Sequence, residues 1–301
     1  MFSVDPLFSF ESSLFYFRFI FFSLAIFYFI ENKNNFLLYF KYILYFSLTI
    51  LLIDGSIQYI TGSNIFSFES MPGRIGSLFG DRYVLGHYVV RMIPILFALF
   101  ALNKNIDKYE IIFFFFFLIG LSIIVLISGD RSAFLLLIIE TILFLLLLKR
   151  FRLFMLSYLF IILISISTII IISPSIKDRL IDKTIDQLQI NGNNIVLFSA
   201  YHERIFLTGY NMFAAKPFIG HGPKLFRVLC VEEIYYVKEG GCSSHPHNTY
   251  VQLLAETGIL GTFPIIILNF YIIFLMFKQF MAVNFRFVHL EIDDSKVCLL
   301  I

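Results

Sequence analysis

The sequence predicts an all-α polytopic membrane protein with about seven transmembrane helices and one long external segment that contains short helices. Of the 301 residues, 59% are hydrophobic and only 15% are charged, and the mean hydropathy is +0.85. A soluble domain of this length could not cover so much apolar surface, and long apolar runs recur along the chain. The net charge of +2 is too small to indicate nucleic-acid binding.

Seven apolar stretches reach or approach the ~20 residues that cross the hydrocarbon core of a bilayer. None resembles a cleaved signal peptide, because Asp5 and Glu11 precede the first stretch and no basic cluster does. The expected spans are residues 13–30, 36–53, 84–102, 111–128, 132–148, 153–173 and 256–277.

These spans divide the chain into four expected parts. Residues 1–173 hold the first six spans with short loops, and residues 174–255 form a large external segment that carries the candidate histidines. Residues 256–277 form the last span, and residues 278–301 form a cytoplasmic tail.

Basic residues predict the orientation, because they gather on the cytoplasmic side of membrane proteins. Under strict alternation the N-terminus, the 54–83 loop, the 128–131 turn and the 174–255 segment are external. The cytoplasmic side then holds Lys33, Lys104, Lys108, Lys149, Arg150, Arg152, Lys278 and Arg286.

The external segment is expected to contain three helical stretches. Apolar residues recur at helical spacing within residues 178–189, so this stretch is expected to lie on the membrane surface. A second helix is expected from about residue 200 to 215, and a tight turn over 217–223 follows it. The last helix is expected to begin near Thr249, which has capping-box spacing with Gln252.

Two of the three cysteines, Cys230 and Cys242, lie in the external segment, and Cys298 lies in the tail. In an oxidising compartment Cys230 and Cys242 could close a small disulfide ring. Two unpaired thiols fit the sequence equally well.

The densest group of chemically capable side chains is His245-Pro246-His247-Asn248, where the external segment meets the last span. If a helix begins at Thr249, its dipole disfavours an imidazolium at His247, so the neutral ring could accept a proton. The alternative is a loop histidine that only binds backbone groups. A metal site built on both histidines is less favoured, because no further ligand is positioned to complete it.

Three external arginines suit an anionic ligand such as a diphosphate. Arg131 lies in a turn at the start of a span, Arg204 on the second external helix and Arg74 in the Gly73–Gly76 turn. A guanidinium matches phosphate oxygens and keeps its charge, and a helix N-terminus favours anions. The alternative is that each arginine contacts lipid headgroups.

Charged residues also occur inside expected spans. Glu140 lies near the middle of one span, and Arg91 lies inside another with His87 one turn before it. Such residues are costly unless they are paired or face a cavity, so Arg91 could pair with Glu140. The sequence contains no Gly-rich phosphate loop, zinc-type cysteine pair or Ser-x-x-Lys pattern, so no cofactor is expected.

At the C-terminal side, the motifs resemble the O-antigen ligase and O-antigen polymerase superfamily. That family's hallmark is a histidine followed by Asn, Ser or Gln, then nine residues and Gly-x-x-Gly. Here the hallmark reads His247-Asn248, residues 249–257 and Gly258-Ile259-Leu260-Gly261.

Three further elements resemble the same family in the expected order. Arg204 and residues 217–222 resemble an Arg-bearing helix that leads into a Pro-x-x-Gly-x-Gly turn. Ser128-Gly129-Asp130-Arg131 resembles the family's Ser-x-x-Arg turn, and residues 73–81 resemble its Arg-x-x-Gly-x-Phe element. The resemblance covers about residues 70–277.

The resemblance implies an inverting, metal-independent glycosyltransferase without a cofactor. Such an enzyme moves a glycan from undecaprenyl diphosphate to lipid A-core at the periplasmic face of the bacterial inner membrane. Its partners are the lipid-linked donor, the acceptor and membrane lipids, with no nucleic acid.

By this analogy His247 is the general base that deprotonates an acceptor hydroxyl. Arg131 and Arg204 bind the diphosphate and stabilise the leaving-group charge in place of a metal ion. Arg74 is a weaker candidate for the same role, and Asn248 positions the histidine. The remaining substrate-binding candidate is His245.

Two other functions remain open. A polymerase would use the same donor with a second lipid-linked glycan as acceptor, and the sequence separates the two poorly because acceptor choice lies in loop shape. A transporter or flippase would need Arg91 and Glu140 rather than His247, and its repeat-related broken helices have no counterpart in an internal repeat here. Family members commonly have further spans, so a truncated and inactive form is also an expectation.

Overall fold

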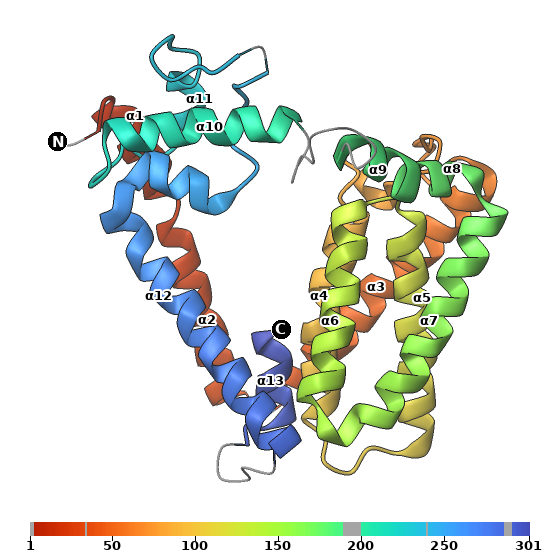
Figure 1. The fold of residues 1–301 in the computed structure, drawn as a ribbon. Coiled ribbons are helices and arrows are strands. Elements are labelled where there is room, and N and C mark those ends of the chain that lie inside the picture. Colours follow the sequence, from red (N-terminus) through yellow and green to blue (C-terminus); the bar gives the residue numbers. More distant parts are fainter. Residues whose placement is uncertain (1–2, 34, 189–199, 239, 286–290) are drawn as a thin grey trace. The chain divides into compact units, whose positions relative to one another are not determined.

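The computed structural model describes residues 3–33, 35–188, 200–238, 240–285 and 291–301. Within these ranges the regular structure is helical, and the only strand-like pairings are two isolated bridges, Ser63 with Glu69 and Met71 with Arg74. The chain divides into two compact units (Figure 1). Unit 1 comprises Met1–Lys33 and Ile185–Ile272, and unit 2 comprises Asn34–Thr184 and Ile273–Ile301.

Unit 2 contains most of the long helices. They are α3 (Phe36–Thr61), α4 (Leu85–Ala101), α5 (Lys108–Ile127), α6 (Arg131–Leu147) and α7 (Arg152–Ile172), together with α8 (Pro174–Lys177), α13 (Asp294–Leu300) and the end of α12. Two 3₁₀ turns (Ser77–Phe79 and Lys149–Phe151) and a π-helical turn (Asp178–Asp182) join them.

Unit 1 contains the N-terminal helices and most of the 174–255 segment, for which an external position stays a prediction. Its helices are α1 (Pro6–Leu14), α2 (Phe17–Asn32), α10 (Ala200–Ala215), α11 (Phe226–Leu229) and most of α12 (Thr249–Phe285). Helix α9 (Lys183–Leu188) crosses the boundary between the units. The Asp178 to Gln189 stretch is therefore helical up to Leu188, and Gln189 lies outside the described residues.

Each of the seven expected spans coincides with a helix, and the all-helical prediction is confirmed for the described residues. Five helical segments there are long and apolar enough to cross a membrane: Pro6–Asn32, Phe36–Thr61, Lys108–Ile127, Lys149–Ile172 and Thr249–Phe285. The other two, α4 and α6, have 17 residues each, so the number seven stays a prediction.

An aromatic core holds the helices of unit 2 together. Phe97 on α4 is fully buried, and its ring lies 4.7 Å from Phe144 on α6 and 5.2 Å from Phe114 on α5. Phe114 in turn stacks on Phe100 with 3.9 Å between ring centroids. These offset and edge contacts join three helices around one apolar centre.

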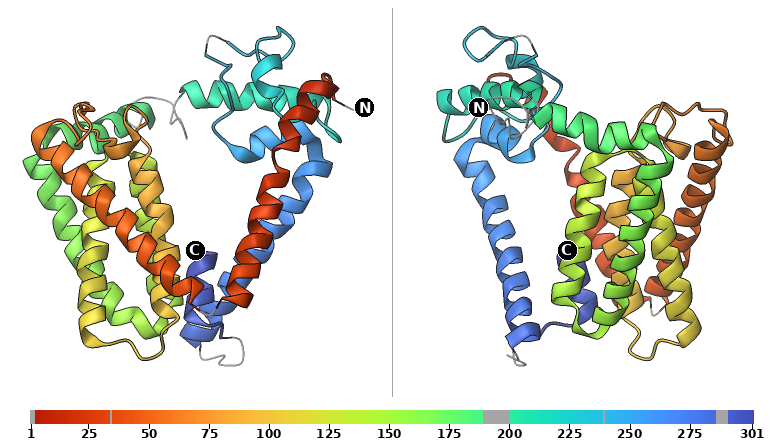
Figure 2. Two further views of the ribbon diagram at one scale, coloured as in Figure 1. Left: turned by 180° about the vertical axis from the view of Figure 1, so that it is seen from behind. Right: turned by 45° about the vertical axis from the view of Figure 1, so that its right-hand side comes forward.

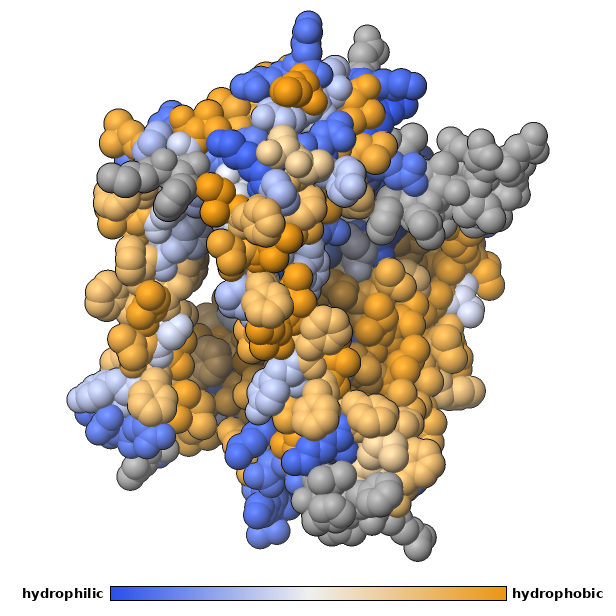
Figure 3. Space-filling model, turned by 60° about the vertical axis from the view of Figure 1, so that its left-hand side comes forward, coloured by the Kyte–Doolittle hydropathy of each residue, from blue (hydrophilic) through white to orange (hydrophobic). Residues whose placement is uncertain are grey.

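Apolar side chains also cover the outside of the long helices. Helix α2 has no buried residue, and Phe270, Phe274 and Phe277 on α12 are exposed. On one face of the molecule, hydrophobic side chains cover the long helices and hydrophilic ones gather toward the ends (Figure 3). Exposed apolar surface of this extent suits contact with lipid tails rather than with water.

The C-terminal residues differ from the expected polar tail. Helix α12 continues to Phe285, and α13 buries Val297 and Cys298 in the core of unit 2. The apolar residues of this short helix find partners on α4, which a hydropathy scan for full spans does not detect. Arg286 of the proposed cytoplasmic set lies outside the described residues.

Candidate functional site

Asn248 begins the helix that follows the histidines. Its Oδ1 accepts hydrogen bonds from the backbone N–H groups of Tyr250 (2.9 Å) and Val251 (3.1 Å). Asn248 is therefore the N-cap, and Thr249 is already the first helical residue. The capping-box prediction for Thr249 was wrong by one residue, because Asn248, itself a preferred N-cap residue, already accepts from the first free N–H groups.

His247 stands directly before this cap on unusual backbone. Its φ is +55°, a left-handed conformation that residues other than glycine seldom adopt. The side chain is exposed. Its ring centroid lies 4.2 Å from that of His245 and 5.3 Å from that of His202 on α10. Three imidazoles therefore gather at the start of α12.

The surroundings of His247 favour its neutral form. Partial burial lowers the pKa of His247 from its ordinary value, and the neighbouring imidazoles of His245 and His202 lower it further. A neutral imidazole close to a helix N-terminus can accept a proton near pH 7. The geometry thus gives His247 the protonation state that a general base needs.

Helix α12 breaks at Gly258, and the 217–223 turn fills the break. Gly258 has φ +63° and ψ −165°, and a Cβ there would lie 2.5 Å from the Phe218 carbonyl carbon and oxygen. Only glycine fits such close backbone approach. Four backbone N–H groups bond across the contact, from Ile259 to Pro217 (2.8 Å), Leu260 to Phe218 (3.1 Å), His221 to Ala255 (3.1 Å) and Gly222 to Glu256 (2.8 Å).

The loop before the histidines is closed covalently. Cys230 and Cys242 form a disulfide, so the first of the two alternatives for these cysteines holds. Cys230 is fully buried in a small core with Ile205 and Met212 of α10. The disulfide therefore ties the chain just ahead of His245 to Cys230, which packs against the helix that carries His202.

Arg204 is half-buried on α10, two residues after His202. Residues two apart start about 200° apart around a helix, so Arg204 leaves α10 on a different face from His202. Of these two side chains, the ring contact with His247 belongs to His202. Arg204 and His247 belong to the same unit.

The backbone segments that carry Arg74 and Arg131 of unit 2 meet at one point. A Cβ on Gly129 would overlap the Gly73 carbonyl oxygen, and a Cβ on Gly73 would lie 2.5 Å from the Ser175 carbonyl oxygen. The Arg74 turn, the Arg131 turn and the 173–179 segment are therefore in direct backbone contact.

Arg179 joins Arg74 and Arg131 at this point. Its Nε donates to the Gly129 carbonyl at 2.8 Å. Burial lowers the pKa of Arg74, and the positive charge of Arg179 lowers it further. Asp130, which caps α6, is the carboxylate that opposes these charges. Three guanidinium groups and one carboxylate leave an excess of positive charge, which favours an anion.

Two of these guanidinium groups are only partly engaged. The Arg74 Nη2 donates to the Tyr83 carbonyl at 3.1 Å, while its Nε is buried without a hydrogen-bond partner among the described residues. Arg131 reaches the Lys183 carbonyl and the Thr184 hydroxyl only at 3.4 Å each. Weakly used donors of this kind remain open to a phosphate.

Buried polar residues on α3 fix the Arg74 loop. Gln58 Oε1 accepts from the N–H groups of Gly76 (3.0 Å) and Ser77 (2.6 Å). Asp54 accepts from the Ile65 N–H (3.0 Å) and from the Ser77 hydroxyl (2.5 Å). The loop expected to start at residue 54 therefore starts at 62. Asp54 and Gln58 remain in the helix because backbone and hydroxyl groups of the loop supply their hydrogen bonds.

The structure thus sorts the expected residues into two groups. His245, His247, Asn248 and Arg204 belong to unit 1, and Arg74 and Arg131 belong to unit 2. Arg179 and His202 complete these groups and were not among the expected residues. A comparison of all external polar residues near span ends would have found Arg179, and the helix that carries Arg204 also carries His202.

The expected partners inside the spans do not meet. Glu140 is buried and its Oε2 lacks a hydrogen-bond partner, whereas Arg91 is exposed, and no ion pair joins them in the described part of the chain. His87 instead contacts the Ser132 hydroxyl (2.9 Å) and Asp130 Oδ2 (3.5 Å).

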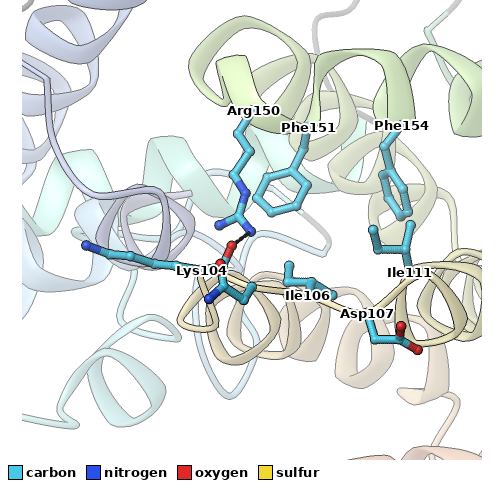
Figure 4. A pocket seen from close by; sticks show the side chains of 8 residues that line it. Lys104, Ile106, Asp107, Ile111, Arg150, Phe151 and Phe154 are labelled. Carbon is cyan, nitrogen blue, oxygen red and sulfur yellow. Dashed lines mark hydrogen bonds between the residues drawn. The ribbon is translucent and has the colours of Figure 1, made fainter.

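A pocket of about 670 Å³ lies elsewhere in unit 2, between the 104–111 segment and the start of α7 (Figure 4). Arg150 points into it and donates to the Lys104 carbonyl at 2.7 Å. Phe151 and Phe154 line its wall. Its basic residues belong to the set expected on the cytoplasmic side, and it contains none of the residues of either group.

A family model described as O-Antigen ligase matches residues 114–266, just over half of the chain. The match includes Arg131 and Arg179 in unit 2 and the histidine cluster with Gly258 in unit 1, and it begins after Arg74. No curated protein and no solved structure matches the chain.

Proposed function

Because the chain belongs to the O-antigen ligase family, we propose that it is an inverting glycosyltransferase acting on undecaprenyl diphosphate-linked glycan. Lipid A-core is the proposed acceptor, and the periplasmic face of the inner membrane is the proposed place of reaction. Members of this family are membrane proteins that transfer glycans in lipopolysaccharide and polysaccharide biosynthesis. One observation carries the proposal. His247 lies exposed at the start of an apolar helix inside the matched segment, and its surroundings lower its pKa and so favour the neutral ring.

In the proposed reaction His247 takes the proton from an acceptor sugar hydroxyl. The hydroxyl oxygen then forms a bond to the anomeric carbon of the donor, and the bond from that carbon to the diphosphate oxygen breaks on the opposite side. This displacement inverts the anomeric centre. Asn248 contributes by holding the start of α12, which fixes the backbone of His247.

The diphosphate leaves with additional negative charge, and positive groups that are already in place stabilise it most effectively. Arg131, Arg74 and Arg179 of unit 2 are assigned this role, and Arg204 is assigned it as the family resemblance implies. The guanidinium groups supply the charge that a metal ion supplies in other transferases, which makes the proposed reaction independent of metal. His245 is assigned to the acceptor side next to the base.

The test is glycan transfer by the purified full chain in detergent with EDTA. It receives lipid-diphosphate-linked glycan with and without lipid A-core, and the variants are His247→Ala and Tyr250→Phe. Loss of a general base lowers the rate about 10²–10⁴-fold. Tyr250→Phe removes one exposed hydroxyl from the next turn and should keep the wild-type rate.

Each outcome decides between functions. Product that requires lipid A-core supports the ligase, and longer lipid-linked chains without it support the polymerase. Full activity of His247→Ala would show that the base is another residue. Glu140→Gln and Arg91→Gln, which a transporter would not tolerate, should retain transfer, and no product from folded wild-type protein would contradict the proposal.

A further inference from the structure

His202 supplies a third imidazole beside the proposed base. It lies in the first turn of α10, and its ring is 5.3 Å from that of His247 at an interplanar angle of 69°. His245, from the same loop as His247, lies 4.2 Å away at 54°. Among the residues that the structure describes, His245 from its own loop and His202 from α10 are the titratable groups whose charge disfavours a proton on His247.

The position of His202 is set by the packing of α10. Ile205 and Met212 of this helix are fully buried in the core of unit 1. Gly209 lies so close to α12 that a Cβ would overlap Val251, and both views of Figure 2 show α10 against the first part of α12. His202 is therefore brought to His247 by a packed helix rather than by a free side chain.

A positive charge on His245 or His202 disfavours a second positive charge on His247 a few ångströms away. His247 is in ring contact with both of the other imidazoles and is partly desolvated, so a proton on it is disfavoured from two sides.

We infer that His202 is a positioning residue for His247, whose imidazole disfavours a proton on the base by standing beside it. The inference rests on the proposed function for the role of His247, but the electrostatic effect itself exists without substrate. The inference gives α10 a role through His202 in addition to the role proposed for Arg204. The protonation midpoint of His247 should then depend on the charge at position 202.

The experiment is a pH titration of histidine-labelled full chain in detergent micelles, followed by NMR. The protein has six histidines, and the signal of His247 is assigned by its loss in His247→Gln. The compared proteins are wild type, His202→Gln, His202→Lys and His87→Gln. The last is the same substitution in unit 2 and serves as the control.

We expect the His247 midpoint to move to higher pH in His202→Gln, because a repelling neighbour is removed. It should move to lower pH in His202→Lys, because the positive charge becomes permanent, and should stay unchanged in His87→Gln. Shifts of opposite sign cannot arise from a merely structural role. Equal midpoints in His202→Gln and His202→Lys would overturn the inference.

Glycan transfer gives the second readout, with lipid-diphosphate-linked glycan as the probe. A base works when neutral, so its activity falls as the pH drops through its pKa. In His202→Gln the acid limb should move to higher pH, which lowers the ratio of the rates at about pH 6 and about pH 8 roughly twofold. Shifted midpoints with no transfer by any protein would refute the proposed function and leave the electrostatic coupling standing.

Discussion

Unit 1 and unit 2 hold different parts of the proposed chemistry and hold them in different ways. In unit 1, His245 and His247 are exposed on irregular backbone, and His202 is half-buried on α10, next to a small core closed by a disulfide. In unit 2, buried polar side chains of α3 fix the Arg74 loop, which contacts the segments that carry Arg131 and Arg179, beside a large aromatic core. A base must exchange protons with water, whereas an anion site gains most from charges that do not move. The proposed base in unit 1 therefore needs access to water, and the proposed anion site in unit 2 needs a rigid backbone.

The largest expected effect separates the two units by function. Arg131→Ala should lower transfer about 10²-fold, because a charge-stabilising group is lost, and Arg131→Lys should restore part of it through charge alone. Arg179→Ala should behave in the same way if the three arginines share one anion. Binding of undecaprenyl diphosphate, measured by calorimetry in detergent, should weaken in both variants.

His247→Ala is the matched control for that comparison. It should bind undecaprenyl diphosphate as wild type does, since the histidine acts on the acceptor. Equal loss of diphosphate binding in His247→Ala and Arg131→Ala would show that the division of roles between the units is wrong.

An intermediate effect tests how unit 1 keeps its histidines in place. Gly258→Ala should lower the free energy of unfolding by about 3 kcal/mol, because the new Cβ meets the Phe218 carbonyl and the backbone conformation is strained. Gly62→Ala in unit 2 also has a positive φ, of +86°, but its Cβ would meet nothing within 4 Å. It should cost about 1 kcal/mol.

Thermal unfolding in detergent measures both variants. The difference between them isolates the contact of the 217–223 turn with the break in α12. Similar losses for Gly258→Ala and Gly62→Ala would mean that this contact does not stabilise unit 1.

The helices could be predicted from the sequence because their signals are local. Apolar runs located the helices of the seven expected spans, and Pro217 marked the end of α10. The end of α3 was placed too early because Asp54 and Gln58 are polar, and polarity alone does not reveal that a loop will satisfy them. Composition and hydropathy indicate which stretches avoid water. They do not indicate which partners a buried polar side chain will have.

The candidate site was predicted in part for the same reason. The motif around His247 is contiguous in sequence, so it could be recognised without the fold. His202 contacts His247 across 45 positions, and Arg179 bonds Gly129 across 50, so only tertiary packing unites them. Neither residue carries a local signal that separates it from an ordinary surface side chain.

The smallest expected effect concerns the rigidity of the arginine loops. Asp54 is fully buried and both of its carboxylate oxygens accept hydrogen bonds. Asp54→Asn keeps one acceptor and replaces the other with a donor, which should lower the free energy of unfolding by about 1–2 kcal/mol. The exposed Asp81→Asn in the same loop is the matched control and should change it by less than about 0.5 kcal/mol.

Loosening the loop should weaken diphosphate binding by a few fold through Arg74 and leave the NMR midpoint of His247 unchanged, because the histidine belongs to the other unit. Binding calorimetry and the histidine titration on the same Asp54→Asn sample test both halves of this prediction. A shifted His247 midpoint with intact diphosphate binding would contradict the prediction. It would show that the Asp54 hydrogen bonds act on the histidines and not on the arginines. Unchanged binding and an unchanged midpoint would show that Arg74 contributes nothing to the anion site, and would leave Arg131 and Arg179 to hold the diphosphate.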